Sequence, residues 1–325
     1  LLDPLLNPIP MQTQTIAKAL GYLTADGSIL FDSDGGQRQI RATSWDGFQF
    51  SNMILSGLWE YGRNFKSVID QMASGVNVPI GDGINTLVIP ISGDIFVTNA
   101  TPPGSAVGAT SNPELQGLTC LEVLDEIVDY AYSKKISVIF SYASRSASSG
   151  PDTPVDGTHT QAVWIANNVT LATRYVNNPG VIGINIFATP ADPLTWATWA
   201  TMAEACANAI HAVAPNLITI VQGVGTNPDT TQHWPGAALK GASTRPITIN
   251  QQNKLVYGTV EYGQSMATQP WLSTTTVPVA NYPLNVHDVF SAQWSFIAQQ
   301  DIAPVFVSQF GGLLGFDGNG PTASQ

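Results

Sequence analysis

Charged side chains are scarce in this sequence. Only 11% of its 325 residues are Asp, Glu, Lys or Arg, where about 25% is usual in globular proteins. The 12 basic residues are outnumbered by 23 acidic ones, so the formal charge is −11. A sparse and acidic surface excludes a basic nucleic-acid interface. A hydrophobic content of 44% also excludes a disordered chain, because disorder combines low hydrophobicity with high charge density.

Cysteines are few and long apolar runs are absent. Cys120 and Cys206 allow at most one internal disulfide. Both lie in apolar, helix-like surroundings, so a bridge and two buried thiols are equally open alternatives. No apolar run approaches the roughly 18 residues of a membrane helix, so we expect no membrane span. Residues 1–20 begin apolar but contain Asp3 and three prolines in the first ten positions, and we interpret them as an extended arm rather than a signal peptide.

Motifs for several kinds of chemistry are missing as well. The sequence has no Gly-rich phosphate loop and no Gly-x-Ser-x-Gly elbow, so nucleotide-binding and serine-hydrolase functions have no support. His211, His233 and His287 show no metal-ligand spacing with Asp, Glu or Cys, and we interpret them as surface or helix-end residues. His159 lies in a Thr-rich helix start, where a solvated role is expected. We therefore expect neither a metal ion nor a cofactor.

The sequence does contain short, continuous apolar runs of the kind found in strands that are buried on both faces. Amphipathic helical patterns lie between most of them, and Thr119 followed by Glu122 predicts a capped helix start. This alternation predicts a parallel sheet with helical crossovers. Seven strands and no Gly-rich turn after the first favour a (β/α)8 barrel over a doubly wound sheet. The predicted strands are Ile40–Trp45, Asn85–Ile91, Ser137–Tyr142, Val181–Phe187, Leu217–Gly223, Leu255–Tyr262 and Ala303–Phe310, and the predicted helices are Phe65–Met72, Leu121–Ile136, Thr158–Val176, Trp196–Val213 and Val286–Ala298.

Seven local segments resemble glycoside hydrolase family 5, and in particular its secreted bacterial-type endoglucanases. They follow one another in the family's order and at about its spacing, over residues 21–312. The segments are SWDGFQFSNMILSGLWEYG (44–62), GINTLVIPIS (83–92), LQGLTCLEVLDEIVDYA (115–131), NPGVIGINIFATPADP (178–193), APNLITIVQGV (214–224), KLVYGTVEY (254–262) and IAPVFVSQFGG (302–312).

The resemblance implies a TIM-type barrel and a retaining hydrolysis by two carboxyl groups about 5 Å apart. The family's acid/base lies in Asn-Glu-Pro after strand 4, and the matching residues here are Ala188, Thr189 and Pro190. Its nucleophile lies in Glu-Phe-Gly on strand 7, and the matching residue here is Gln309. An amide is a poor nucleophile and a hydroxyl is a far weaker acid than a carboxyl group, so we expect the family's catalysis to be lost.

Most of the supporting positions implied by the resemblance have also lost their charged or ionisable side chains. The strand-2 Arg falls at Val88, the strand-3 His at Ala143 and the strand-6 His at Val260, whereas the strand-6 Tyr is retained as Tyr262. Only Tyr262 keeps the family's residue type among these positions. The sequence therefore predicts a barrel whose catalytic end has become neutral.

A dead hydrolase can still bind sugar, because aromatic rings stack on pyranose faces without any acid pair. Six rings lie at or just after predicted strand ends and are candidate sugar contacts, although packing of loops onto the barrel is the alternative role. We assign Trp196, Trp199 and Trp294 to the core because they have helical spacing. The candidate rings are Trp45, Phe48, Tyr142, Trp234, Tyr262 and Trp271.

A displaced acid pair is the alternative to lost catalysis. Glu261 precedes Tyr262 at the end of strand 6, and Asp46 and Asp94 follow strands 1 and 2. Barrel enzymes place their chemistry at these strand ends. This second hypothesis is an active β-glycanase that uses relocated carboxyl groups.

The predicted domain organisation is an arm (1–20), a barrel (21–312) and a flexible tail (313–325). Only Gly312–Gln325 follows Gln309-Phe310-Gly311 at the end of strand 7, so we expect strand 8 and the last helices of the family's barrel to be missing from the chain and the barrel to be incomplete. An open edge favours self-association or a partner that completes the barrel. Asn99 and Asn168 are N-glycosylation sequons. We expect a secreted, extracellular pseudo-glycosidase with a structural or β-glucan-binding role.

Overall fold

The computed structural model describes residues 21–59, 62–74, 83–147, 150, 152–272 and 278–312. The predicted arm (1–20) and tail (313–325) lie outside these residues. No helix within the described ranges is both long and apolar enough to cross a bilayer.

Seven parallel strands form the main sheet of the described chain, and each pairs with the next in sequence order. All seven predicted strands are confirmed. Their apolar runs are buried on both faces, which explains why none of the central strands alternates between polar and apolar residues. The strands are β3 (Ala42–Ser44), β4 (Thr86–Ser92), β5 (Ser137–Ser144), β6 (Val181–Asn185), β7 (Ile218–Gln222), β8 (Leu255–Tyr262) and β9 (Val305–Gly311).

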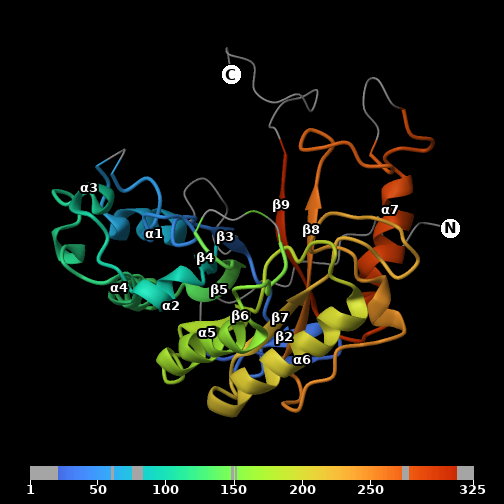
Figure 1. The fold of residues 1–325 in the computed structure, drawn as a ribbon, viewed down its shortest axis with the longest axis horizontal. Coiled ribbons are helices and arrows are strands. Elements are labelled where there is room, and N and C mark those ends of the chain that lie inside the picture. The colour runs from blue at the N-terminus through green and yellow to red at the C-terminus, as the bar shows by residue number, and fades with distance from the viewer. Residues whose placement is uncertain are drawn as a thin grey trace.

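Helices cover the outer side of this sheet (Figure 1). The predicted helices are confirmed, with ends that move by a few residues. Thr119 and Glu122 form the predicted capping box, in which the Thr119 backbone N–H donates to Glu122 Oε2 at 2.7 Å. The helices are α1 (Phe65–Ser74), α2 (Asp94–Thr98), α3 (Gly104–Val107), α4 (Cys120–Ser133), α5 (Gln161–Arg174), α6 (Trp196–Val213), α7 (Asn285–Phe290) and α8 (Phe296–Gln299), with 3-10 turns η1 (Pro113–Leu115) and η2 (Lys240–Ser243) and a π-helical turn η3 (Ser291–Ser295) between α7 and α8.

The sheet curls into the barrel-type architecture that the sequence predicts. One small cavity is lined both by Ser44 of β3 and by Phe306 of β9, so the first and last strands of the sheet approach the same interior. No pairing between β3 and β9 is found within the described residues. The carboxyl ends of β3 to β9 form one end of the curled sheet, which we call the mouth.

A short antiparallel hairpin closes the opposite end of the sheet. It consists of β1 (Thr24–Asp26) and β2 (Ile29–Phe31), two three-residue strands too short to stand out in the sequence pattern. Leu23 and Leu30 pack with interior side chains of the main sheet such as Ile182 and Val256. The buried Lys254 side chain donates from Nζ to the Leu23 carbonyl at 2.6 Å. The hairpin thus fills the interior at this end of the sheet, and the mouth is the end at which barrel enzymes place their chemistry.

Candidate functional site

The interior below the mouth holds a cavity of about 30 Å³. This volume admits one water molecule and not a sugar ring. Neither an ionisable acid nor a base lines it, as far as the described residues show. The lining includes Ser44, Val88, Ala143, Asn185, Gln222 and Gln309.

Thr189 occupies the acid/base position that the resemblance implies. It follows β6, and its backbone N–H donates to Gln222 Oε1 at 2.6 Å. Gln222 Nε2 donates to Ser308 Oγ at 2.5 Å, and Ser308 Oγ donates to the Thr259 carbonyl at 2.9 Å. This chain of neutral hydrogen bonds occupies the centre of the mouth and contains no carboxyl group that could donate a proton.

The backbone at Thr189 is itself unusual. Its φ is +48°, in the left-handed region that β-branched residues rarely adopt. Such strain persists only where the surrounding structure enforces it. Here the tight hydrogen bond to the buried Gln222 holds the turn after β6 in place.

Gln309 occupies the nucleophile position on β9. Its Oε1 accepts a hydrogen bond from the Tyr262 hydroxyl at 2.7 Å. Burial raises the pKa of Tyr262, and the negative charge of Asp46 adds to this effect. Asp46 therefore lies near enough to Tyr262 to raise the pKa of its hydroxyl. The phenol stays neutral and donates its hydrogen bond to the amide oxygen of Gln309.

The other positions that the resemblance implies are apolar in the structure. Val88 and Val260 are buried at 8% and 1% exposure, and Ala188 is buried beside Thr189. Ala143 lines the small cavity. None of these four side chains can donate a hydrogen bond or carry charge, so nothing at these positions could hold a carboxylate at Gln309 in an ionised form.

Glu261 belongs to a different environment from Tyr262. Successive residues of a strand point to opposite faces, and Glu261 Oε1 accepts a hydrogen bond from Trp294 Nε1 of η3 at 2.7 Å. His233 Nε2 lies 3.6 Å from the same oxygen. Burial raises the pKa of Glu261 to about 8. Its side chain is only 10% exposed and faces the helical side of β8, whereas Tyr262 faces Gln309.

Among the described residues, the hydrogen bonds of Asp46 and Asp94 are made to their neighbouring loops and not to Glu261. Asp46 is exposed and accepts a hydrogen bond from Ser44 Oγ at 3.1 Å. Asp94 begins α2 and accepts a hydrogen bond from the Ala147 backbone N–H at 2.8 Å. Among the described residues these carboxylates organise the loops after β3, β4 and β5.

The aromatic side chains are less available than the sequence predicts. Phe48 and Tyr142 are buried at 0% and 2% exposure, and their prediction as sugar contacts is wrong. Tyr142 packs against Phe187 with ring centroids 6.0 Å apart, and its hydroxyl accepts from Asn167 Nδ2. Phe48 and Tyr142 therefore have the alternative role, in which the rings pack loops onto the barrel.

Two tryptophans form one buried aromatic cluster beside Tyr262. Trp234 and Trp271 are 8% and 7% exposed. Trp234 meets Tyr262 edge to face at 5.5 Å, and Trp271 stacks on His233 at 4.2 Å. The indole N–H groups of both tryptophans are buried without a hydrogen-bond partner in the structure. Tyr262 and Tyr282, which pack against this cluster, are partly exposed.

Further exposed or partly exposed rings lie in the loop after β3 and at the end of β9. Trp45 is partly exposed, and its Nε1 donates to the Ser56 carbonyl at 2.9 Å. Phe50 and Phe310 are 43% and 77% exposed, and neither is among the six rings predicted from the sequence. The signal was available, because Phe50 follows β3 and Phe310 lies near the end of β9.

Three further predictions are corrected or decided by burial. His233 is neither a surface nor a helix-end residue: its side chain is fully buried, and burial lowers its pKa to about 3. Trp294 is partly exposed but packs against the main core cluster as predicted, and its Nε1 also donates to Glu261. Cys120 and Cys206 are free and buried, which resolves the alternative left open by the sequence.

Glycosylation of Asn168 is also contradicted. Asn168 is fully buried within α5, and its Nδ2 donates to the Trp164 carbonyl at 3.0 Å. Attachment of a glycan requires this nitrogen to be accessible. Asn99 is partly exposed, and its Oδ1 accepts from the Leu121 backbone N–H at 3.2 Å. This contact uses the side-chain oxygen and not Nδ2, the nitrogen that would carry a glycan, so glycosylation of Asn99 stays a prediction.

Comparison with known proteins identifies the family. Residues 41–323 match the family model described as cellulase (glycosyl hydrolase family 5). An endoglucanase of Paenibacillus polymyxa is 28% identical over 304 residues, which cover 91% of this chain and 72% of that protein. The major extracellular endoglucanase of Xanthomonas campestris is 25% identical over 307 residues, 91% of this chain and only 59% of that protein.

Solved structures agree with this assignment. The catalytic domain of the major endoglucanase of Xanthomonas campestris superposes with a TM-score of 0.80 at 25% identity, covering 90% of this chain and 82% of that one. A complex of the Pyrococcus horikoshii endocellulase with cellotetraose has the same fold, with a TM-score of 0.79 at 21% identity over 93% of this chain and 84% of that one. The chain belongs to glycosyl hydrolase family 5, the cellulase family, and carries Thr189 and Gln309 where the resemblance implies the two catalytic carboxyl groups.

Proposed function

We propose that this chain is a secreted, non-catalytic member of the family that binds β-glucan-like polysaccharide. The observation that carries the proposal is the neutral hydrogen-bond network at the mouth, in which Thr189 and Gln309 pair with Gln222 and Tyr262. Retaining hydrolysis needs one ionised and one protonated carboxyl group on opposite sides of the scissile bond. Thr189 and Gln309 carry a hydroxyl and an amide, so neither position supplies a carboxyl group.

Polysaccharide binding is supported by what the mouth retains. Tyr262 and Trp45 keep partly exposed rings, and Phe50 and Phe310 add exposed ones. Aromatic faces of this kind bind the CH groups of a pyranose ring. Relatives in the family are named as endoglucanases, and one of them as extracellular, which supports a glucan ligand and secretion.

A structural role in an extracellular assembly is the second part of the proposal. Among the described residues, β3 and β9 are the two edges of the main sheet, and Phe310 at the end of β9 is largely exposed. Unpaired sheet edges are sites of association with another chain. Sedimentation velocity over a range of protein concentrations tests this part, and a monomer at every concentration would contradict it.

Turnover and binding must be measured on the same preparation. We expect no release of reducing ends from carboxymethylcellulose, together with a calorimetric signal on titration with cellotetraose. Tyr262→Ala is expected to weaken this binding, whereas Thr201→Ala on the exposed face of α6 serves as a remote control. Absence of any binding by the wild type would overturn the proposal.

The same turnover assay decides about displaced catalysis. If the wild type releases product and Glu261→Gln abolishes that release, the chain is an active β-glycanase with relocated acids. Glu261 Oε1 is bound to Trp294 and its side chain is nearly buried, so we expect neither result.

A further inference from the structure

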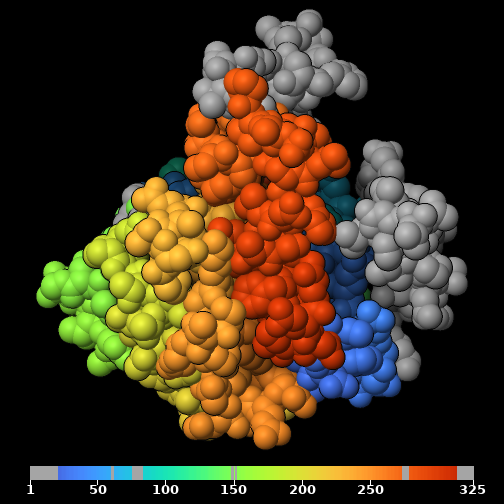
Figure 2. Space-filling view, turned by 90° about the vertical axis from the view of Figure 1, so that its right-hand side faces the viewer, coloured from blue at the N-terminus to red at the C-terminus, as the bar shows by residue number. Residues whose placement is uncertain are grey.

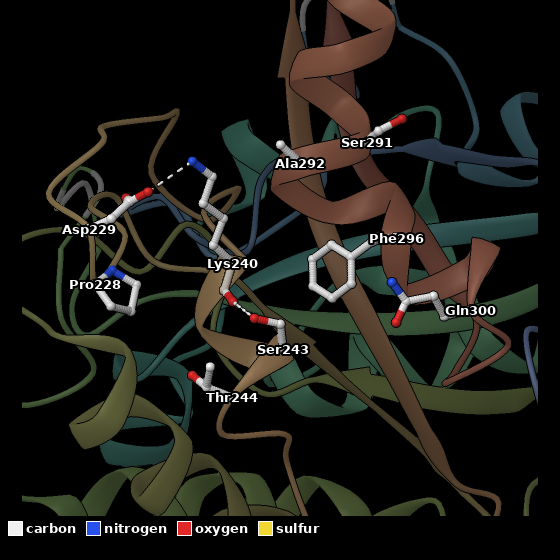
Figure 3. Close-up of a pocket in the computed structure, with 9 residues that line it drawn as sticks. All are labelled: Pro228, Asp229, Lys240, Ser243, Thr244, Ser291, Ala292, Phe296 and Gln300. Carbon is white, nitrogen blue, oxygen red and sulfur yellow. Dashed lines mark hydrogen bonds and ion pairs between the residues drawn. The ribbon is translucent and has the colours of Figure 1, made fainter.

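A groove of about 440 Å³ lies on the flank of the barrel, away from the mouth. One wall is the connection between β7 and β8, and the other is the helical segment η3–α8 that leads into β9 (Figure 3). None of its lining residues lines the small cavity at the mouth. Figure 2 faces this flank and shows the red helical segment beside the gold and orange β7–β8 connection.

The groove exists because one crossover of the barrel lacks a long helix. The connections after β5 and β6 contain α5 and α6, with 14 and 18 residues. The connection after β7 contains only the four-residue turn η2. A four-residue turn cannot fill the width of a crossover helix, which is about 10 Å, so a hollow remains between η2 and η3.

The two walls are fixed to each other by buried polar contacts. Asn227 Nδ2 donates to Gln293 Oε1 at 2.7 Å, and both residues are at most 5% exposed. Asn227 Oδ1 accepts from the Lys240 backbone N–H at 3.1 Å. A loop anchored in this way keeps its shape without a ligand, which lowers the entropic cost of binding one.

The helical wall has a local irregularity at the groove. Residues Ser291–Ser295 form a π-helical turn, a feature that occurs frequently at functional sites. Ser291 and Ala292 of this turn line the groove, while Gln293 of the same turn binds Asn227. The irregular turn therefore both shapes the hollow and anchors its opposite wall.

The lining combines one aromatic ring with neutral polar groups. Figure 3 shows the Phe296 ring between Lys240 and Ser243 on one side and Gln300 on the other. The charges of Asp229 and Lys240 cancel in an ion pair of 3.1 Å. A groove with no net charge has no attraction for phosphate or carboxylate ligands, whereas a flat ring with hydroxyl and amide neighbours matches a neutral pyranose.

We propose that this groove is a second carbohydrate-binding site, which takes a short segment of a neutral glycan with one sugar ring stacked on Phe296. Ser243 and Gln300 hydrogen-bond the sugar hydroxyls from the two walls. The site goes beyond binding at the mouth, because a chain bound at two separate places on the molecule would be held with higher avidity.

Cellotetraose titrations of matched variants test the site. Ala292→Arg fills the groove from an exposed position, and Phe296→Leu keeps apolar volume but removes the flat ring. Thr201→Arg on the exposed surface of α6 adds the same charge elsewhere. We expect Ala292→Arg and Phe296→Leu to remove one class of sites or weaken it about tenfold, with Thr201→Arg unchanged.

A fluorescence signal from the groove distinguishes binding there from binding at the mouth. Phe296→Trp places a fluorophore in the groove, and its emission should shift with cellotetraose even when Tyr262→Ala is combined with it. Wild-type affinity and stoichiometry in Ala292→Arg and Phe296→Leu would overturn the groove site while leaving the mouth untouched. Loss of all binding in Tyr262→Ala alone would overturn it too.

Discussion

The buried carboxyl group of Glu261 gives the sharpest stability prediction. Burial raises the pKa of Glu261 from 4.5 to about 8, while the Trp294 N–H lowers it by a smaller amount. His233 Nδ1 accepts the Trp234 backbone N–H at 2.9 Å, so its proton is on Nε2. Burial lowers the pKa of His233 to about 3. Near neutral pH the 3.6 Å contact between His233 and Glu261 therefore joins two uncharged groups.

The pH dependence follows from the difference between the folded and unfolded pKa of Glu261. Below pH 4.5 the carboxyl group is protonated in both the folded and the unfolded chain, so its burial does not make the free energy of unfolding depend on pH. Between pH 4.5 and 8 the unfolded chain releases the proton and the folded chain keeps it, so the free energy of unfolding falls by about 1.4 kcal/mol per pH unit. The accumulated loss at pH 7 is about 3 kcal/mol, and it levels off above pH 8.

Glu261→Gln removes this loss. The amide oxygen still accepts the Trp294 N–H, and the side chain no longer titrates. We expect equal stability of variant and wild type near pH 4.5 and an advantage of about 3 kcal/mol for the variant at pH 7. The titration of His233 affects both proteins and cancels in the difference. Urea unfolding followed by tryptophan fluorescence at the two pH values measures it.

Glu126→Gln is the matched control for this experiment, because Glu126 is exposed on α4. It shows what the same substitution does to stability at an exposed position. If Glu261→Gln gains nothing at pH 7, or gains as much at pH 4.5 as at pH 7, then burial does not control this carboxyl group and the reasoning is refuted.

Three further predictions concern buried or strained residues. Asn168→Ala should cost about 1 to 2 kcal/mol, because it removes a buried hydrogen bond to Trp164, and glycopeptide mapping should find no glycan on Asn168 in the wild type; occupancy there would contradict the burial. Thr189→Gly should stabilise the chain by about 1 kcal/mol by relieving the φ of +48°, and a lower melting temperature would show that the side chain matters more than the strain. Burial raises the pKa of the Cys120 and Cys206 thiols, so a thiol reagent should react only after unfolding, and rapid reaction of the native protein would argue against their burial.

The order of strands and helices was predictable from sequence because it depends on local patterns. Strands buried on both faces contain continuous apolar runs, as in Leu87–Ile91 of β4, and every predicted run became a strand. The Thr119–Glu122 capping box depends on residues three positions apart. The absence of charge at Val88, Thr189, Val260 and Gln309 was visible for the same reason, since a missing carboxyl group can be read at a single position once the family's register is known.

Tertiary structure decided which side chains meet and which remain accessible. Trp294 binds Glu261 from 33 positions away, and Asn227 binds Gln293 from 66 positions away. Hydrophobic periodicity describes one element and carries no information on which loop packs on which helix. For that reason the sequence by itself determined a family 5 barrel with a neutral mouth, whereas only the packed chain showed that Phe48 and Tyr142 are buried, that His233 faces Glu261, and that the short β7–β8 crossover leaves a groove around Phe296.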